Sequence, residues 1–241
     1  MAGFWGRLLG FLFPDNLTCI FCGDELNGNA TDGVCDECFK ELPFNNGKVC
    51  VKCGVQLKSD ANICMHCKNT YFTFLQARSS FVYEGKIAHL VKTYKYDNKM
   101  YLSKVVAPFM VNTYLINKFD ADVIIPVPLY KWRKFHRGFN QSELLANQIG
   151  KTLNIPVVVN NLVRVRKTKT QTKLTSKERE VNLTNAFRVL NAKELKGKKV
   201  LLVDDVFTTG STVEFCAREL QKADVNKTLV LCLASVSQYG I

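Results

Sequence analysis

The pattern of hydrophobic residues changes near residue 77. Beyond it, apolar residues recur at helical spacing in segments 84–96 and 100–116, which predicts two helices separated by the polar pair Asp97-Asn98. Before it, cysteines, glycines and polar residues break up any regular spacing. A chain of 241 residues can hold one ordinary domain and a smaller one. We therefore expect two domains, residues 1–76 and 77–241.

In the second part, strand patterns alternate with helical ones. Segment 120–129 predicts a buried strand that runs into a rigid turn at Pro126 and Pro128. This alternation of strands and helices is typical of an α/β domain with a mainly parallel sheet. The other predicted strands are 156–159, 162–166, 198–205 and 227–237, and the other predicted helices are 140–155 and 211–223, the second with Ser211 and Thr212 as caps.

The segment VLLVDDVFTTGST, residues 200–212, joins a predicted strand to a helix. In the loop that precedes the helix, Gly210 permits close backbone approach, and the loop amides and the helix N-terminus favour a phosphate. Asp204 and Asp205, just upstream, would repel that phosphate unless they bind something else, such as sugar hydroxyls or a divalent ion. A ligand with a phosphate beside a diol meets both demands, and a ribose 5-phosphate is such a ligand.

Eight of the ten cysteines form four Cys-x-x-Cys pairs before residue 70. Two such pairs supply the four thiolates of a closed zinc site, and we expect two structural zinc ions rather than disulfides. Sequential pairing closes shorter loops than crossed pairing, and we favour it, with His66 a bystander. The expected ligands are Cys19, Cys22, Cys35 and Cys38 for one ion and Cys50, Cys53, Cys64 and Cys67 for the other.

Charge is distributed unevenly along the chain. Residues 1–76 hold six Lys/Arg against eight Asp/Glu, a net of −2, whereas residues 77–241 hold 27 against 13, a net of +14. A positive field confined to one part favours an anionic partner such as a nucleotide or nucleic acid, although a solubilising excess is the alternative. The apolar start, residues 1–14, lacks the features of a signal peptide, and we expect a short helix there. With no apolar stretch of about 20 residues, we expect no membrane span and a cytoplasmic location.

Three segments carry a resemblance to a known family. Residues 200–212 look like the phosphoribosyl pyrophosphate (PRPP) motif of type I phosphoribosyltransferases, and IIPVPLYKWRKFHRGFNQSELLA, residues 124–146, is similar to a segment of the ComF family of competence-associated proteins. Segment 164–187 is a third match, and the cysteine-rich region resembles the family's double zinc ribbon. The resemblance covers residues 14–235. It implies a phosphoribosyltransferase-like parallel sheet with helices on both faces, after a small N-terminal double zinc ribbon.

The resemblance also implies a ligand and roles for the site residues. PRPP would bind with Mg²⁺ bridging its pyrophosphate and ribose oxygens. Asp204 and Asp205 would contact the ribose hydroxyls and, in an enzyme, act as the catalytic pair beneath the developing positive charge. Arg133 and Lys134 would lie near the pyrophosphate. The 5-phosphate would be held by Thr208, Thr209, Gly210, Ser211 and Thr212.

The residues leave the acceptor and the reaction open. The covering loop of related enzymes corresponds to residues 167–182, which could close over pyrophosphate or follow a nucleic-acid backbone. Three classes follow: a phosphoribosyltransferase of nucleotide metabolism with an unidentified acceptor, a PRPP-binding protein that handles single-stranded DNA during uptake, and an adaptor whose zinc ribbons dock on another competence protein. The expected covering-loop or nucleic-acid contacts are Arg137, Lys167, Lys169, Lys173 and Arg179.

Overall fold

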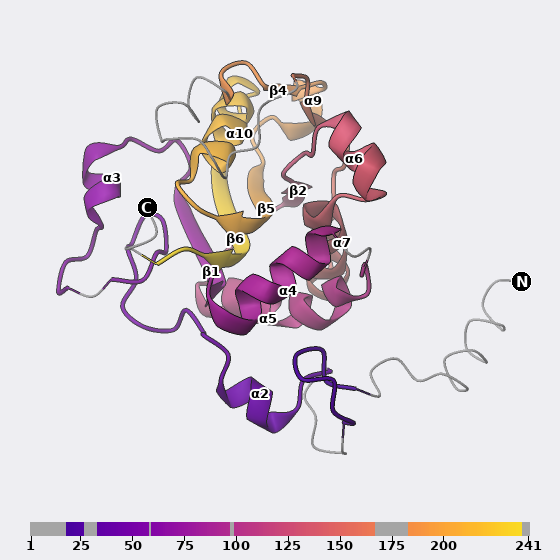
Figure 1. Cartoon of the computed structure of the whole chain (residues 1–241). Coiled ribbons are helices and arrows are strands. Elements are labelled where there is room, and N and C mark those ends of the chain that lie inside the picture. The colour runs from indigo at the N-terminus through magenta and orange to yellow at the C-terminus, as the bar shows by residue number, and fades with distance from the viewer. Residues whose placement is uncertain (1–17, 27–32, 58, 97–98, 167–182, 238–241) are drawn as a thin grey trace, which may run out of the picture. The chain divides into compact units, whose positions relative to one another are not determined.

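The chain divides into two units, Met1–Leu42 and Pro43–Ile241 (Figure 1). The computed structural model describes residues 18–26, 33–57, 59–96, 99–166 and 183–237. The short helix expected within residues 1–14 lies outside these ranges. Within them, no helix has the length and apolar character that a membrane crossing requires.

The smaller unit is built around its cysteines. An antiparallel bridge between Thr18 and Glu25 closes the turn that carries the first pair. Cys35 is the N-cap of α2 (Asp36–Lys40), a helix of five residues. A helix this short is marginal by itself in water, so its stability must come from contacts beyond its own hydrogen bonds.

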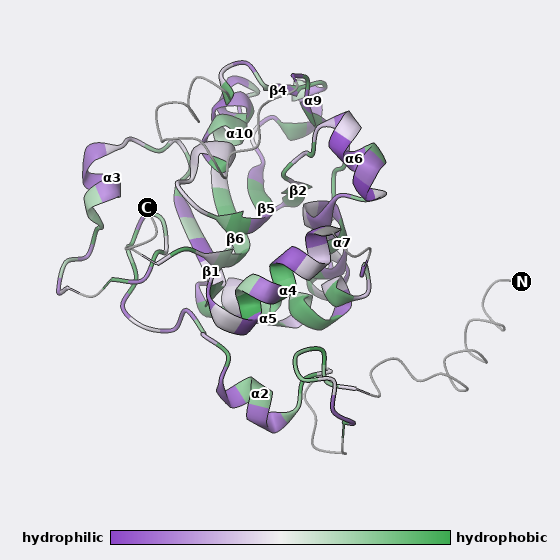
Figure 2. Cartoon of the chain, in the orientation of Figure 1, coloured by the Kyte–Doolittle hydropathy of each residue, from purple (hydrophilic) through white to green (hydrophobic). Residues whose placement is uncertain are grey.

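A four-stranded parallel sheet forms the centre of the larger unit. The predictions for β2 (Val123–Pro126), β5 (Lys199–Phe207) and β6 (Lys227–Ser235) are confirmed, whereas β1 (Gln76–Val82) was not predicted. The strand order is β1-β6-β5-β2, and every adjacent pair is parallel. Its central strands are strongly apolar, as expected for a parallel sheet buried on both faces (Figure 2).

Helices cover both faces of this sheet. Val200 and Leu202 of β5 belong to one buried cluster with Cys216 of α10 (Ser211–Lys222). Leu201 and Val203, which alternate with them along β5, are also fully buried and point to the opposite face, which α7 (Gln141–Leu153) covers. The predicted helices α4 (Gly85–Tyr96) and α5 (Leu102–Ile116) are present, and α5 packs against α7, β1 and β6.

The remaining elements are short. They are α3 (Met65–Asn69), α6 (Lys131–Arg137), the antiparallel pair β3 (Leu162–Arg164) and β4 (Phe187–Val189), and α9 (Ala192–Leu195).

Two local predictions were wrong. Segment 156–159 forms an isolated parallel bridge between Val157 and Ile124 rather than a strand. The N-cap of α10 is Gly210, not Ser211 or Thr212, because the turn requires a φ of 78°, which glycine adopts without a steric penalty.

The second cysteine quartet lies in the larger unit. Cys50 and Cys64 belong to the same buried cluster as Val200 and Leu202 of β5, so this ribbon packs onto the sheet domain. The boundary expected between residues 76 and 77 divides the chain by sequence motif and stays a prediction, whereas the division by contacts falls between residues 42 and 43.

Candidate functional site

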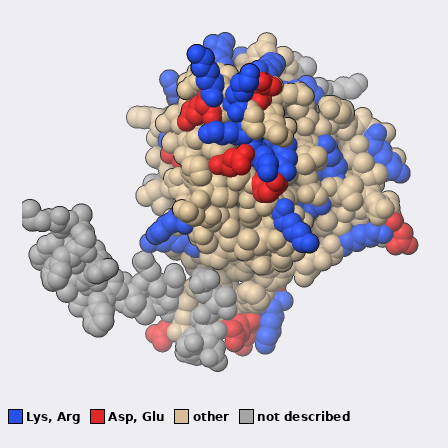
Figure 3. All heavy atoms as spheres, turned by 180° about the vertical axis from the view of Figure 1, so that it is seen from behind, with Lys and Arg blue, Asp and Glu red and all other residues tan. Residues whose placement is uncertain are grey.

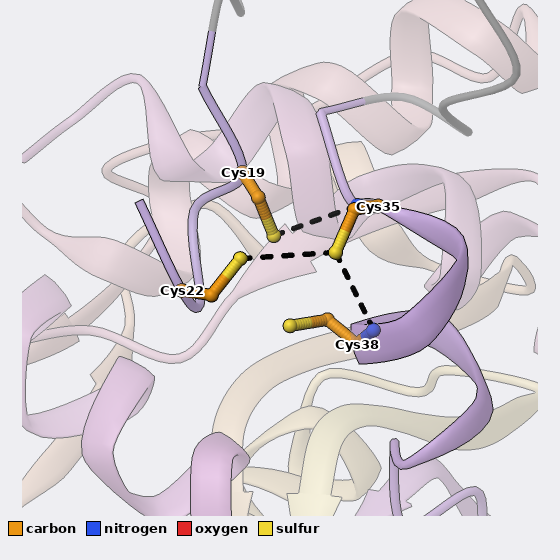
Figure 4. Close-up of side chains that lie close together, drawn as sticks. All are labelled: Cys19, Cys22, Cys35 and Cys38. Atoms are coloured by element: carbon orange, nitrogen blue, oxygen red, sulfur yellow. Dashed lines mark hydrogen bonds between the residues drawn. The ribbon is translucent and has the colours of Figure 1, made fainter. Parts of the chain in front are cut away.

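The eight paired cysteines form two clusters. Within each cluster the four sulfur atoms lie within 4.8 Å of one another, and the grouping is the sequential one. In the first cluster, two side chains come from the turn before α2 and two from the start of α2, and all four sulfurs point toward one centre (Figure 4). The clusters are Cys19, Cys22, Cys35 and Cys38, and Cys50, Cys53, Cys64 and Cys67.

The geometry of both clusters fits zinc. The Sγ atoms of Cys22 and Cys35 are 3.7 Å apart, as are those of Cys53 and Cys64. A tetrahedral ion with Zn–S bonds of about 2.3 Å separates its sulfurs by about 3.8 Å, whereas a disulfide joins them at about 2.05 Å. Backbone N–H groups point at the sulfurs, for example from Cys67 to Cys64 Sγ at 3.4 Å, as suits thiolate ligands. The chain thus holds two closed four-cysteine sites.

His66 is not needed by the second quartet, in agreement with the sequence interpretation. Its Nε2 atom instead lies 3.0 Å from the backbone oxygen of Thr209, in the loop between β5 and α10. The zinc ribbon and that loop are therefore in direct contact, although 143 positions separate the two residues.

A pocket of 600 Å³ opens beside the C-terminal half of β5. Strand β2 ends at Pro126, opposite Val203, so β5 continues past the end of that neighbour. Ligands of open parallel sheets bind outside the carboxyl ends of the strands, and this pocket has that position. Its polar lining side chains are Tyr83, Lys92, Lys95, Arg133, Arg137, Asn140, Gln141, Ser142, Arg164, Asp204, Asp205, Thr208 and Thr212.

The two acids lie together in this pocket with different partners. Asp204 Oδ1 accepts hydrogen bonds from Ser142 Oγ at 3.0 Å and from the amide of Asp205 at 2.9 Å. Asp205 Oδ2 forms an ion pair with Lys95 Nζ of α4 at 2.9 Å. Burial and the neighbouring Asp205 carboxylate raise the pKa of Asp204 to about 7. Burial opposes the charged form of Lys95, but the attraction of Asp205 outweighs it and raises the pKa of Lys95.

The small-residue loop follows β5 directly. Thr208 and Thr212 line the pocket, and Thr209 Oγ1 and Ser211 Oγ are 2.8 Å apart. Gly210 makes the turn into α10, whose first amides have no partners within the helix. The loop thus combines hydroxyls, backbone donors and a helix N-terminus at the edge of the pocket.

Five basic side chains face two acidic ones in this pocket. Arg133 and Arg137 come from α6, and Arg164 is the last residue of β3. Burial, with a smaller effect from the Arg133 charge, lowers the pKa of Arg164 to about 10, so Arg164 stays cationic at neutral pH. Lys134 is outside the lining: its Nζ lies 2.8 Å from Glu143 Oε2. Because the cations outnumber the carboxylates, the arrangement suits a negatively charged ligand.

Helix α6 carries two solvent-exposed aromatic side chains. Trp132 is 53% exposed and Phe135 is 84% exposed, whereas Phe139, just beyond the helix, is buried against Tyr94. His136 contacts the Trp132 ring at a centroid distance of 4.0 Å and is not among the pocket-lining residues.

Several pocket residues were not singled out from the sequence. Lys95 appeared only as a polar position of a helix, and its contact with Asp205 joins residues 110 positions apart. Arg164 belongs to the predicted strand 162–166, and Ser142 lies at the start of the predicted helix 140–155. Their common signal is a polar residue where an element begins or ends near the sheet edge. The predicted covering-loop residues Lys167, Lys169, Lys173 and Arg179 lie outside the described residues.

Two family models match this chain. The model described as a double zinc ribbon domain matches residues 8–68, and the one described as a phosphoribosyl transferase domain matches residues 139–239. The first includes both four-cysteine sites and the second includes the acid pair and the loop after β5. The observed fold and the matched domains agree.

Relatives match along nearly the whole chain. The chain is 34% identical to competence protein F of Haemophilus influenzae over 229 residues, which cover 91% of this chain and 97% of that protein. It is 29% identical to DNA utilization protein YhgH of Salmonella typhimurium, covering 83% of this chain and 89% of the relative. Among solved structures, a purine phosphoribosyltransferase from Pyrococcus horikoshii is 21% identical, with a TM-score of 0.35, covering 54% of this chain and 70% of that one.

Proposed function

The chain belongs to the ComF family, and on that premise we propose that its larger unit binds PRPP together with Mg²⁺ and that the protein serves DNA uptake. The observation that carries the first part is one pocket in which an acid pair, a phosphate-type loop and a group of cations meet. The names of the relatives, a competence protein and a DNA utilization protein, support the second part.

Each part of PRPP has a counterpart in the pocket. The ribose hydroxyls would donate to Asp204 and Asp205, and the 5-phosphate would accept from the loop 208–212. The pyrophosphate would lie toward Arg133, Arg137 and Arg164. Mg²⁺ prefers oxygen ligands, which the pyrophosphate, the ribose and the acid pair supply, and it would neutralise charge on the leaving pyrophosphate.

The same arrangement suits phosphoribosyl transfer. In that reaction the bond between ribose C1 and the pyrophosphate oxygen breaks, the electron pair leaves with pyrophosphate, and an acceptor nucleophile forms a bond to C1. In this proposal Asp204 and Asp205 would stabilise positive charge on the ribose, and the arginines that line the pocket would stabilise the leaving group. Lys95 would hold Asp205 in place during this change.

Pyrophosphate release tests this function. The zinc-loaded protein would be incubated with PRPP and Mg²⁺ and with separate pools of nucleobases, amines and single-stranded DNA, beside the Asp204→Asn/Asp205→Asn variant. Release that depends on one pool and is lost in the variant is the result expected of an enzyme. Stabilisation of the wild type by PRPP in thermal unfolding without release would mean a sensor or structural ligand. If PRPP causes no pyrophosphate release and no thermal stabilisation of the wild type, that result would contradict PRPP binding.

A second role, contact with single-stranded DNA, is favoured by α6. Its exposed rings, Trp132 and Phe135, lie among four basic residues of the same helix. In proteins that bind single-stranded nucleic acid, aromatic rings stack on the bases and cationic side chains contact the phosphate backbone. Net charge alone would not locate such a contact, because acidic side chains lie among the basic ones on the face that Figure 3 shows.

A fluorescent oligothymidine titration tests the α6 contact. Trp132→Ala/Phe135→Ala should weaken DNA binding by about 1 to 3 kcal/mol for each base that no longer stacks on an aromatic ring. Tyr71→Ala is the matched control, because Tyr71 is 81% exposed but lies outside α6. The salt dependence should stay the same in all three proteins, because the phosphate contacts are kept. Equal affinities of the α6 variant and the Tyr71 control would exclude this surface.

A further inference from the structure

The second zinc ribbon reaches the loop after β5 through α3. His66 is the second residue of α3 and lies between the zinc ligands Cys64 and Cys67. Its Nε2 is 3.0 Å from the Thr209 oxygen, so a protonated Nε2 donates a hydrogen bond to that carbonyl. The helix has only five residues, and its N-cap is Cys64, so the position of the imidazole depends on the metal site that holds both ends of this turn.

This hydrogen bond fixes a peptide plane of the loop. In a trans peptide the carbonyl and the following N–H point in opposite directions, and the described chain has no cis peptide bond. With the Thr209 carbonyl held toward His66, the Gly210 N–H points away from the ribbon. The ribbon therefore constrains the direction of one backbone amide of this loop.

Packing reinforces the same contact. A Cβ atom on Gly210 would lie 2.6 Å from the Phe207 ring and 3.1 Å from the Phe72 ring, so the loop is closely packed against the segment that follows α3. Phe72 is itself in edge contact with His66, at a centroid distance of 5.5 Å. The loop has little freedom to move on this side while the ribbon is in place.

A third contact joins the same segment to the first turn of α10. The amide and the hydroxyl of Thr73 donate to the two carboxylate oxygens of Glu214, at 2.7 and 2.8 Å. Glu214 is 4% exposed and also accepts from Arg218. Residues 64–74 thus contact both the loop and the helix that follows it.

From these contacts we propose that the second zinc site sets the affinity of the loop for the ligand's 5-phosphate, with His66 as the positioning residue. The inference rests on the proposed binding of PRPP. The zinc ion holds α3, His66 holds the Thr209 carbonyl, and the loop amides are oriented before the ligand arrives. A preorganised loop has less entropy to lose on binding, which raises affinity.

Replacement of His66 tests the proposal. His66→Ala should keep two zinc ions per chain and weaken PRPP binding by about three- to tenfold, the usual effect of one hydrogen bond. His66→Gln, whose amide can donate from a similar distance, should restore affinity to within about twofold. Calorimetric titration gives the affinities, and metal analysis gives the zinc content.

The choice of ligand separates positioning from general destabilisation. Ribose 5-phosphate should lose affinity for His66→Ala by the same factor as PRPP, whereas inorganic pyrophosphate, which does not occupy the loop, should bind as it does to the wild type. Equal losses for all three ligands would overturn the proposal and point to a general disturbance of the pocket.

The two quartets provide a matched pair for the metal itself. Cys64→Ser/Cys67→Ser should remove one zinc ion and reduce PRPP affinity, whereas Cys35→Ser/Cys38→Ser should remove the other ion and leave affinity unchanged. If the first of these variants fails to fold, the His66 variants decide. If the wild type and His66→Ala bind PRPP with equal affinity, this inference alone is overturned. If the wild type binds neither PRPP nor ribose 5-phosphate, the proposed function is overturned as well.

Discussion

Asp204 and Asp205 are neighbours on one strand, yet they have different surroundings. Asp205 has a cation, Lys95, at 2.9 Å, whereas Asp204 accepts from a hydroxyl and a backbone amide. A cation stabilises a carboxylate more strongly than neutral donors do. Burial and the neighbouring Asp205 carboxylate raise the pKa of Asp204, whose own partners are neutral donors.

This difference predicts how stability depends on pH. The folded pKa of Asp204, about 7, lies above the value of an unfolded chain, so the folded protein keeps a proton that the unfolded chain has lost. The free energy of unfolding should therefore fall as pH rises, by up to about 1.4 kcal/mol per pH unit between about pH 5 and 7. Above that range Asp204 is ionised in both states, so the stability that its proton gave is lost and its pH dependence ends. Denaturant unfolding across this range measures it.

The Asp204→Asn variant is the control for that measurement. It has no carboxyl to titrate at this position, so its stability should change less with pH than that of the wild type. Parallel curves for the two proteins would mean that Asp204 has an ordinary pKa in the folded state.

At the scale of elements, the two ribbons share a Cys-x-x-Cys-Gly turn but differ in what surrounds its glycine. Gly23 has a φ of 82° and Gly54 a φ of 70°, so both need the left-handed conformation. A Cβ on Gly54 would lie 2.5 Å from the backbone oxygen of Ala77, at the start of β1, whereas one on Gly23 would meet nothing within 4 Å. The second turn is packed on the sheet.

Alanine substitutions should separate these two turns. Gly23→Ala should cost about 1 kcal/mol, the conformational penalty alone. Gly54→Ala should cost more than about 2 kcal/mol, because β1 or the turn must also shift. Thermal unfolding of the full chain, with zinc content measured in parallel, compares them. Equal losses would show that the second ribbon yields to the added methyl group without disturbing the sheet.

The sequence was informative where one element carries its own signal. The apolar runs of β5 and β6 and the amphipathic period of α7 are local patterns, and so are the eight cysteines. Strand β1 was missed because its residues, QARSSFV, mix polar and apolar side chains without a clear period. The strand predicted at 162–166 is confirmed as β3, whereas its antiparallel partner β4 has only three residues, too few for a pattern to emerge.

The candidate site was predicted only in part, for a similar reason. The acid pair and its loop form one contiguous motif, whereas Lys95, Ser142 and Arg164 reach the pocket from three separate elements. Their placement depends on how the helices pack on the sheet, and no local spacing encodes it. The contact of His66 with Thr209 is of the same kind.

Across the whole molecule, the parts of the chain before and after residue 77 differ in charge. The part before residue 77 is slightly acidic and the rest strongly basic, with a net of −2 against +14 from the sequence. An anionic ligand or nucleic acid is therefore expected to bind the larger unit. Docking of the cysteine-rich part on another competence protein stays a prediction, as does a cytoplasmic location.

The central claim is that the pocket beside β5 binds PRPP. The most direct measurement is a calorimetric titration of PRPP with Mg²⁺ into the zinc-loaded wild type and the Asp204→Asn/Asp205→Asn variant. We predict saturable binding at one site per chain in the wild type, weakened at least about tenfold in the variant, because the ribose hydroxyls lose charged acceptors. A folded, zinc-loaded wild type that shows no binding, or a variant that binds as tightly as the wild type, would contradict it.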